Sequence, residues 1–328
     1  MRDQLADACR GEVSPDAPCG ARAPAAEGSL RPGDWVEVRS PAEIASTLDG
    51  DGAVEGLPFM PEMVPWCGQR LRVALRAEHT CVHPPEGRLR RLRNAVTLEG
   101  LRCDGASHAG CQLGCALFWK ECWLRPVTGP SAPAVPAGPA ASADLANLPV
   151  HPRGAPDRWQ CQGTALPAAT SRGEPLWSPG QYVRMVEVRT FTARQVVEML
   201  LAGGMRRVRK VLRRRASSPP APAPSAAPLR VGDWVQVRGR EEIFATLDEH
   251  GKLQGLAFGG DMEDYCGVRA RVGARVERII EEATGRLRTV RGTVILERVS
   301  CRRYLGCARA MPILWREAWL RPAPPPGR

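Results

Sequence analysis

The tetrapeptide Gly-Asp-Trp-Val occurs twice in this chain of 328 residues, at 33–36 and at 232–235. A second tetrapeptide, Trp-Leu-Arg-Pro, also occurs twice, at 123–126 and at 319–322. Matching residues between these anchors keep their order, with an offset of 199 residues that falls to 196 by Gly110. Chance similarity would not keep that order, so the sequence indicates a duplicated module of about 95 residues.

The two copies, module one (30–126) and module two (229–322), both contain short alternating apolar runs. In module one, Trp35–Val38 and 71–75 alternate apolar and polar residues, which predicts strands. Ser40 and Glu43 form a capping box that predicts a brief helix over 42–48. Several short strands with one helical turn predict a small, strongly bent barrel or sandwich, so we expect a mainly β protein.

The opening strand, the central hairpin and the closing Trp-Leu-Arg-Pro strand resemble the plan of SH3-like small barrels, including the KOW type. The chain also resembles a family of uncharacterised bacterial cysteine-rich proteins in the motifs Gly-Leu-Pro-Phe-Met-Pro-Glu-Met (56–63), Arg-Cys-Asp-Gly (102–105), Phe-Trp-Lys-Glu (118–121) and Cys-Gln-Gly-Thr (161–164). The resemblance implies two SH3-like barrels, each with a short inserted helix. It implies no known activity.

The rest of the chain divides by composition into a flexible N-terminal segment, a Pro/Ala-rich linker, a middle segment, a second linker and a tail: 1–29, 127–156, 157–215, 216–228 and 323–328. Neither linker is expected to have a fixed fold. In the middle segment, Thr192 and Gln195 form a capping pair ahead of apolar residues at helical spacing. We therefore predict a helix over 192–214, broken or kinked at Gly203 and Gly204.

The net charge of +11 comes largely from the end of that helix. Seven basic residues and no acid lie there: Arg206, Arg207, Arg209, Lys210, Arg213, Arg214 and Arg215. The simplest interpretation is a solvated helix end; contact with a nucleic acid, an acidic protein or a membrane surface is the alternative. KOW-like barrels elsewhere often contact RNA, but a fold alone is poor evidence of function.

The sequence has no apolar run of the length that a transmembrane helix needs, and residues 1–29 lack the apolar core of a signal peptide. We therefore expect a cytoplasmic protein without a transmembrane segment. In that reducing compartment, metal binding, burial or redox chemistry explains twelve cysteines better than structural disulfides do.

A glycine-rich loop in module one concentrates residues that can bind a metal. The favoured ligand set is Cys67, Cys103, Cys111 and Cys115, with His108 or Cys81 as substitutes and Cys161 as a further ligand that would tie the middle segment to module one. Zinc is the expected ion because it accepts mixed Cys and His ligands, although four thiolates would also suit an iron-sulfur cluster. The alternative is that these thiols are small buried hydrophobic side chains.

Module two keeps three equivalent cysteines, Cys266, Cys301 and Cys307. Met311 stands where module one has Cys115, and a deletion removes the position of His108. We therefore expect module two to bind metal weakly or not at all.

No convincing catalytic group is evident in the sequence. Cys81 and His83 could react as a pair, but exposed loop residues are the simpler interpretation. The acidic pair Glu281 and Glu282 is expected on the solvated surface. We therefore predict a non-catalytic binding or scaffolding protein with an unidentified protein partner; a metal- or iron-sulfur-dependent redox subunit and a nucleic-acid-binding protein using the basic helix are the alternatives.

Overall fold

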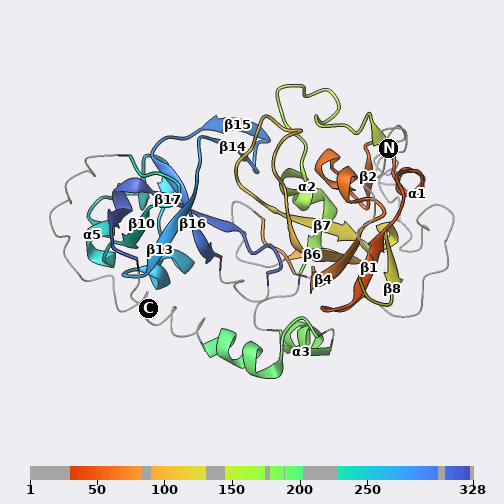
Figure 1. Cartoon of the computed structure of the whole chain (residues 1–328), viewed down its shortest axis with the longest axis horizontal. Helices are drawn as coiled ribbons and strands as arrows, with labels where there is room; N and C mark the ends of the chain where they lie inside the picture. Colours follow the sequence, from red (N-terminus) through yellow and green to blue (C-terminus); the bar gives the residue numbers. More distant parts are fainter. Residues whose placement is uncertain are drawn as a thin grey trace, which may run out of the picture.

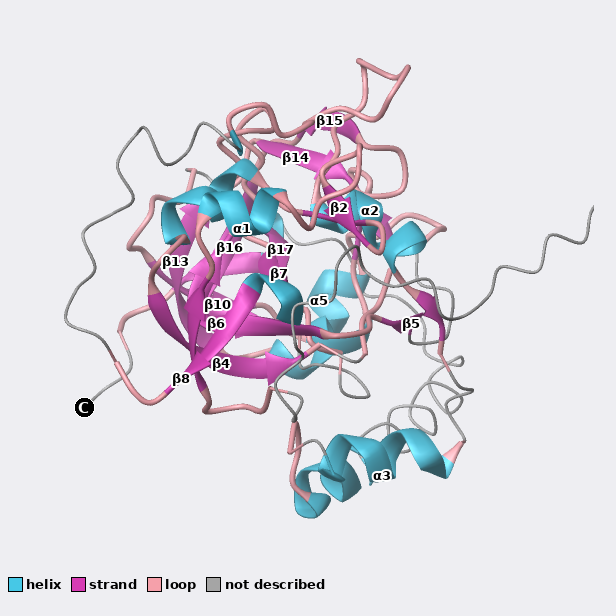
Figure 2. Ribbon diagram, turned by 90° about the vertical axis from the view of Figure 1, so that its right-hand side faces the viewer, coloured by secondary structure: helices cyan, strands magenta, loops and turns pink. Residues whose placement is uncertain are grey.

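The structure is a computed structural model, and it describes residues 30–77, 79–82, 90–130, 145–173, 178–187, 189–201, 228–301 and 307–325. The described chain is mainly β, with two curled five-stranded sheets and few helices. Figure 1 shows the two sheets side by side, each in its own module. The turned view in Figure 2 sets α3 (Pro179–Glu187) below both of them. The prediction of a mainly β protein with two barrel-like modules is confirmed at this level.

Module one contains a five-stranded antiparallel sheet in the order β7-β6-β4-β1-β8. Its strands are β1 (Trp35–Val38), β4 (Arg70–Arg76), β6 (Ala95–Arg102), β7 (Ala116–Lys120) and β8 (Leu124–Val127). Shorter elements connect them: α1 (Pro41–Ala45), β2 (Ala53–Val54), β3 (Leu57–Pro58), the 3₁₀ helices η1 (Pro61–Trp66) and η2 (Glu121–Trp123), and β5 (Arg90–Arg91). The last strand therefore pairs with the first, which curls the sheet.

Module two has the same arrangement, with strand order β17-β16-β13-β10-β18. These strands are β10 (Trp234–Val237), β13 (Arg269–Arg275), β16 (Thr293–Ser300), β17 (Pro312–Arg316) and β18 (Leu320–Pro322). The connecting elements are α5 (Arg240–Phe244), β11 (Lys252–Leu253), β12 (Leu256–Ala257), η4 (Gly260–Tyr265), β14 (Arg278–Glu281), β15 (Arg286–Thr289) and η6 (Glu317–Trp319). The β14–β15 hairpin turns at Thr284 and Gly285.

A pair of fully buried tryptophans anchors the core of each module. In module one, Phe59 packs edge-on against Trp119 and Trp123, with ring centroids 6.0 and 5.1 Å apart. Phe258 has the same relation to Trp315 and Trp319 in module two. Edge-to-face packing adds to the apolar burial of these rings, so the repeated tryptophans are structural.

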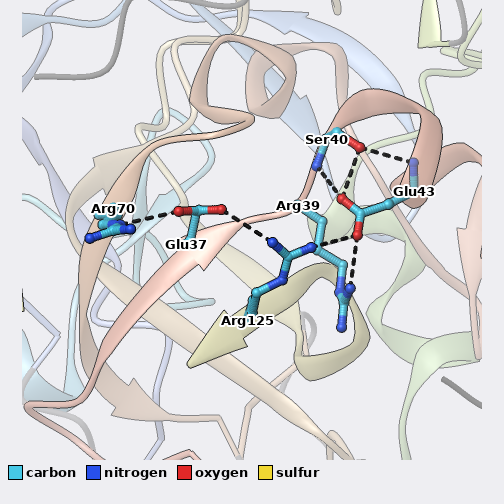
Figure 3. A network of polar contacts seen from close by, with 6 residues as sticks. All are labelled: Glu37, Arg39, Ser40, Glu43, Arg70 and Arg125. Atoms are coloured by element: carbon cyan, nitrogen blue, oxygen red, sulfur yellow. Dashed lines mark hydrogen bonds and ion pairs between the residues drawn. The ribbon is translucent and has the colours of Figure 1, made fainter. Parts of the chain in front are cut away.

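The predicted capping box starts α1, although this helix ends at Ala45 rather than at residue 48. The Glu43 carboxylate accepts from the Ser40 amide at 3.0 Å, and the Ser40 hydroxyl accepts from the Glu43 amide at 3.3 Å. Figure 3 shows that Arg39 and Arg125 also donate to Glu43, while Arg125 and Arg70 flank Glu37. The Ser40 amide is the main reason that the pKa of Glu43 falls to about 2.

The described end of the first predicted linker packs against module one. Leu145 is buried in the core of that module, and Arg153 pairs with Asp51 at 2.7 Å. The expectation of a linker without a fixed fold is therefore wrong for residues 145–156, because Leu145 and its neighbours bury apolar surface there.

In the middle segment, α2 (Gln162–Ala169) and β9 (Ser171–Arg172) lie against module one, and β9 pairs with β5. Residues 193–201 are helical, and Thr192 and Gln195 cap that helix reciprocally, which confirms the predicted start. Gly203, Gly204 and the seven basic residues from Arg206 to Arg215 lie outside the described residues. Among the helices that the structure describes, none has the length and apolar character needed to cross a membrane.

Replacing Ser40 with alanine is expected to lower the free energy of unfolding by about 1 kcal/mol, since the N-cap hydroxyl is lost. Ser40→Gly should cost only a few tenths of a kcal/mol, because glycine itself is a tolerated N-cap; module two has Gly239 at the N-cap of α5. Urea denaturation of the two variants measures the difference. Equal losses would contradict a capping role for the hydroxyl.

Candidate metal centre

The cysteine-rich loop joins β6 to β7 and is closed at its base by backbone pairing. The Cys103 amide donates to the Cys115 carbonyl at 2.9 Å, directly after β6 and directly before β7. Within the loop, Gly105 has a φ of 73°, and a Cβ atom there would lie 2.1 Å from the Cys111 carbonyl oxygen. Only glycine fits this approach, and it folds the loop back on itself so that Cys103 and Cys111 face the same space.

Cys161 reaches the loop because Gln162 binds β7. The Gln162 side chain accepts from the Phe118 amide at 2.7 Å and donates to the Phe118 carbonyl at 2.8 Å. These are the two hydrogen bonds that the backbone of a neighbouring strand would make with Phe118. Gln162 is buried, so this pairing fixes the start of α2 against the module. The structure therefore places Cys161 beside the loop, as the sequence suggested for a residue tying the middle segment to module one.

Six residues with side chains that can bind a metal line one cavity of about 20 Å³: Cys103, His108, Cys111, Cys115, Cys161 and Glu282. A cavity of this volume can hold one particle of the size of a water molecule. Cys115 and Cys161 both line the cavity and are half-buried. The rest of the lining is largely apolar and includes Met60, Leu113, Leu117 and Ile280.

His108 lies between an acid and the thiols. Its Nε2 is 3.5 Å from the Cys103 sulfur, and its Nδ1 is 3.0 Å from Oε1 of Glu62. Burial would lower the pKa of His108, but hydrogen bonds with Cys103, Cys111 and Glu62 outweigh it and raise the pKa to about 12. Because ligand atoms of Glu62, Cys103 and His108 lie within 4.8 Å of one another, this group could hold a metal ion.

Glu62 comes from η1 and is almost fully buried. Burial would raise its pKa, but hydrogen bonds from His108 and Ser107 lower the pKa to about 2. Its Oε1 accepts from the amide and the hydroxyl of Ser107, whereas Oε2 has no hydrogen-bond partner among the described residues. A buried carboxylate with a free oxygen beside a histidine is the arrangement that fixes a metal-binding imidazole in proteins.

The thiols differ in their electrostatic surroundings. Burial would raise the pKa of Cys111, but a hydrogen bond from His108 and bonds from the backbone at Leu113 and Ile280 lower it below its ordinary value. Burial raises the pKa of Cys115 and of Cys161. A metal cation would favour the thiolate form of all of these cysteines, because its positive charge offsets the cost of desolvating a buried thiolate.

The β14–β15 hairpin of module two covers the cavity. The Ile280 amide donates to the Cys111 sulfur at 3.3 Å, and the Gln112 amide donates to the Arg278 carbonyl at 2.9 Å. Beside these contacts, Arg309 donates to Glu282 at 2.9 Å, and both side chains are buried. The expectation that Glu282 lies on the solvated surface is wrong, because the guanidinium of Arg309 neutralises it in the interior; Glu281 is exposed as expected.

The other predicted ligands lie elsewhere. Cys67 is buried in the core of module one and does not line the cavity, and burial raises its pKa to about 11. Cys266 packs on the core of module two. Cys81 and Cys307 lie at a separate contact between the modules, and the Cys301 amide donates to the Met311 carbonyl at 2.8 Å. His83 lies outside the described residues, so the proposed Cys81 and His83 pair is not placed.

Sequence reasoning missed Glu62, Glu282 and Arg309. Glu62 belongs to the apolar motif at 56–63. An acid between Pro61 and Met63 could have indicated a functional group, because a buried acid needs a polar or charged partner. Glu282 and Arg309 are 27 residues apart and offer no such signal.

No family model, curated protein or solved structure matches this chain.

Replacing Arg309 with methionine is expected to lower the free energy of unfolding by about 3–5 kcal/mol, because it leaves the buried Glu282 carboxylate without a counter-charge. The matched control is Arg288→Met, which removes an exposed partner of the neighbouring Glu281 and should cost less than about 1 kcal/mol. Denaturant unfolding measures both variants. A loss for Arg309→Met no greater than for its control would contradict the buried pairing.

Proposed function

We propose that this protein is a non-catalytic, metal-stabilised binding or scaffolding protein. The observation that carries the proposal is the convergence of Cys103, His108, Cys111, Cys115 and Cys161 on one small cavity. Zinc is the proposed ion, because a donor set that mixes thiolates and an imidazole suits zinc. When bound, the ion would supply the positive charge that holds buried thiolates together.

A structural role for this ion is favoured over a catalytic one by what surrounds the cavity. Apolar side chains complete much of its lining, and a hairpin of the other module lies over it. Structural zinc sites are closed, whereas catalytic sites keep a position for solvent or substrate. The protein residues have distinct tasks: the cysteines and His108 hold the ion, and Glu62 orients the imidazole.

The modules themselves are proposed to be SH3-like barrels. Support comes from the strand order, in which four strands follow one another as a meander and the fifth pairs with the first after a 3₁₀ turn. A partner protein would find apolar side chains on the middle helices, where Val183, Val197, Leu200 and Leu201 are exposed. These exposed apolar side chains, on α3 and on the helix 193–201, are the proposed contact surface for that partner.

Metal analysis tests the proposal. Purified anaerobically, the full chain should contain zinc and have no visible colour. The double variant Cys103→Ser/His108→Ala should lose one equivalent of zinc, because it removes two ligands from the cavity. Cys67→Ala is the matched control: its thiol is buried in the core, so this variant should lose stability and keep the metal.

A brown protein with an iron-sulfur absorption band would instead support the redox alternative. A metal content that the double variant leaves unchanged would contradict the site at His108.

Replacing Glu62 with glutamine is expected to weaken zinc binding about 10- to 100-fold, since the acceptor of the imidazole proton loses its charge. Competition with a coloured zinc chelator measures the affinity. Glu43→Gln, at an exposed acid of α1, is the control and should leave the affinity unchanged. Equal affinities for both variants would show that Glu62 does not act on the metal site.

A further inference from the structure

On the outer face of the module-one sheet, a carboxylate lies between two arginines. Glu37 of β1 is opposite Arg70 of β4 and Arg125 of β8, and residues opposite one another on neighbouring strands share a face of the sheet. The Glu37 carboxylate accepts from Arg70 at 3.1 Å and lies 3.6 Å from a nitrogen of Arg125, as Figure 3 shows. Arg125 also donates to Glu43 at 2.7 Å. The two arginines of this row therefore meet two carboxylates.

The equivalent row of module two keeps the arginines but not the central carboxylate. Gln236 of β10 is opposite Arg269 of β13 and Arg321 of β18, in the same register as in module one. Both arginines are exposed, and Gln236 is half-buried. Arg321 donates to the side-chain oxygen of Gln236 at 3.1 Å, while the side-chain nitrogen of Gln236 donates to the Gly267 carbonyl at 2.8 Å. With an amide at the position of Glu37, the row has one neutral acceptor and no negative charge.

The second acid of the module-one row has an equivalent in module two that is paired elsewhere. Glu242 corresponds to Glu43, and it accepts from the amide at the N-cap of α5 at 2.7 Å and pairs with Arg238 at 3.4 Å. In the part of the chain that the structure describes, no carboxylate forms an ion pair with Arg269 or Arg321. Two neighbouring cations on one exposed face therefore lack the counter-charge that their equivalents have.

The same exchange of an acid for an amide occurs at a buried cation, and there the protein compensates for it. In module one the buried Lys120 pairs with Glu55. The equivalent residues of module two are Arg316 and Gln254, and Arg316 donates instead to the backbone carbonyls of Gln254 and Leu253. The buried guanidinium thus regains acceptors from the backbone, because a cation without acceptors is costly in the interior. The exposed row can instead take an acceptor from outside the protein.

We propose that Arg269 and Arg321 bind a carboxylate side chain from an acidic peptide segment of a partner protein. The partner's carboxylate lies over Gln236, between the two guanidiniums, as Glu37 does in module one, and it accepts charge-assisted hydrogen bonds from both. The inference rests on the proposed binding function and gives the chemical class of one partner. It does not depend on the metal.

A peptide is favoured over a nucleic acid because carboxylates remain on the same side of module two. Glu297 lies 4.0 Å from Arg271, the next exposed arginine of β13, and Glu242 lies at Arg238. A nucleic acid has a negative charge at every phosphate and would meet these carboxylates along its backbone. A single carboxylate needs only the two guanidiniums.

Peptide binding to the full chain tests the inference. By fluorescence anisotropy, a short labelled peptide of alternating Glu and Ala should bind, and the same peptide with Gln in place of Glu should not. Binding should weaken as the salt concentration rises, because the contact is between exposed charges.

The variant Gln236→Glu should weaken binding of the Glu peptide about 5-fold, the scale of one exposed ion pair, because it supplies the missing carboxylate from within the protein. Arg269→Gln and Arg321→Gln should weaken it by a similar factor. Arg286→Gln is the matched control: it removes an exposed arginine of β15 that is paired with Asp157, and it should leave the affinity unchanged. Circular dichroism checks that each variant is folded.

Equal affinities of the wild-type protein and Gln236→Glu for the Glu peptide would overturn the inference, as would a folded wild-type protein that does not bind it. If a short single-stranded oligonucleotide binds instead of the peptide, and Gln236→Glu weakens that binding, the inference is also wrong and the row contacts phosphates.

Zinc content separates this inference from the proposed metal-stabilised scaffold. If the wild-type protein contains zinc and does not bind the peptide, the scaffold stands and only the acidic partner is wrong. If it contains no metal and binds the peptide with the expected effects of the variants, the metal site is wrong and the acidic partner stands.

Discussion

The reciprocal contact between hairpin and loop is the constraint on which the junction of the two modules depends. Two backbone hydrogen bonds define it, from Gln112 to Arg278 and from Ala308 to His79. Ala308 and His79 are buried, so their bond satisfies polar groups that would otherwise lack partners, whereas Gln112 and Arg278 are exposed. Beside these bonds, the Ile280 amide donates to the Cys111 sulfur, and the Cys307 sulfur lies 3.4 Å from that of Cys81.

This junction contains charged groups and sulfur as well as apolar side chains. Arg309 and Glu282 neutralise each other in the interior, and Glu62 neutralises His108. Buried charges are tolerated when they are paired and hydrogen-bonded, and removal of one partner leaves the other exposed to the full cost of desolvation.

Much of the scaffold follows from local sequence patterns. The alternating run at Trp35–Val38, the capping box of Ser40 and Glu43, and the capping pair of Thr192 and Gln195 are all present as predicted. These features depend on residues a few positions apart, so the sequence contains all the information that they need. The helix predicted over 42–48 ends early at Ala45, and residues 46–48 form a tighter turn in which the Thr47 amide donates to the Ile44 carbonyl at 2.9 Å.

By itself, the sequence determined the order of elements in each module, the loop that carries Cys103, His108, Cys111 and Cys115, and the candidacy of Cys161. Only the tertiary structure decided which thiols share a cavity: it placed Cys67 in a core, brought Cys161 to the loop through Gln162, and set Cys81 beside Cys307. The physical reason is sequence distance. Contacts across 44 or 226 residues depend on how whole modules pack, which no local spacing encodes.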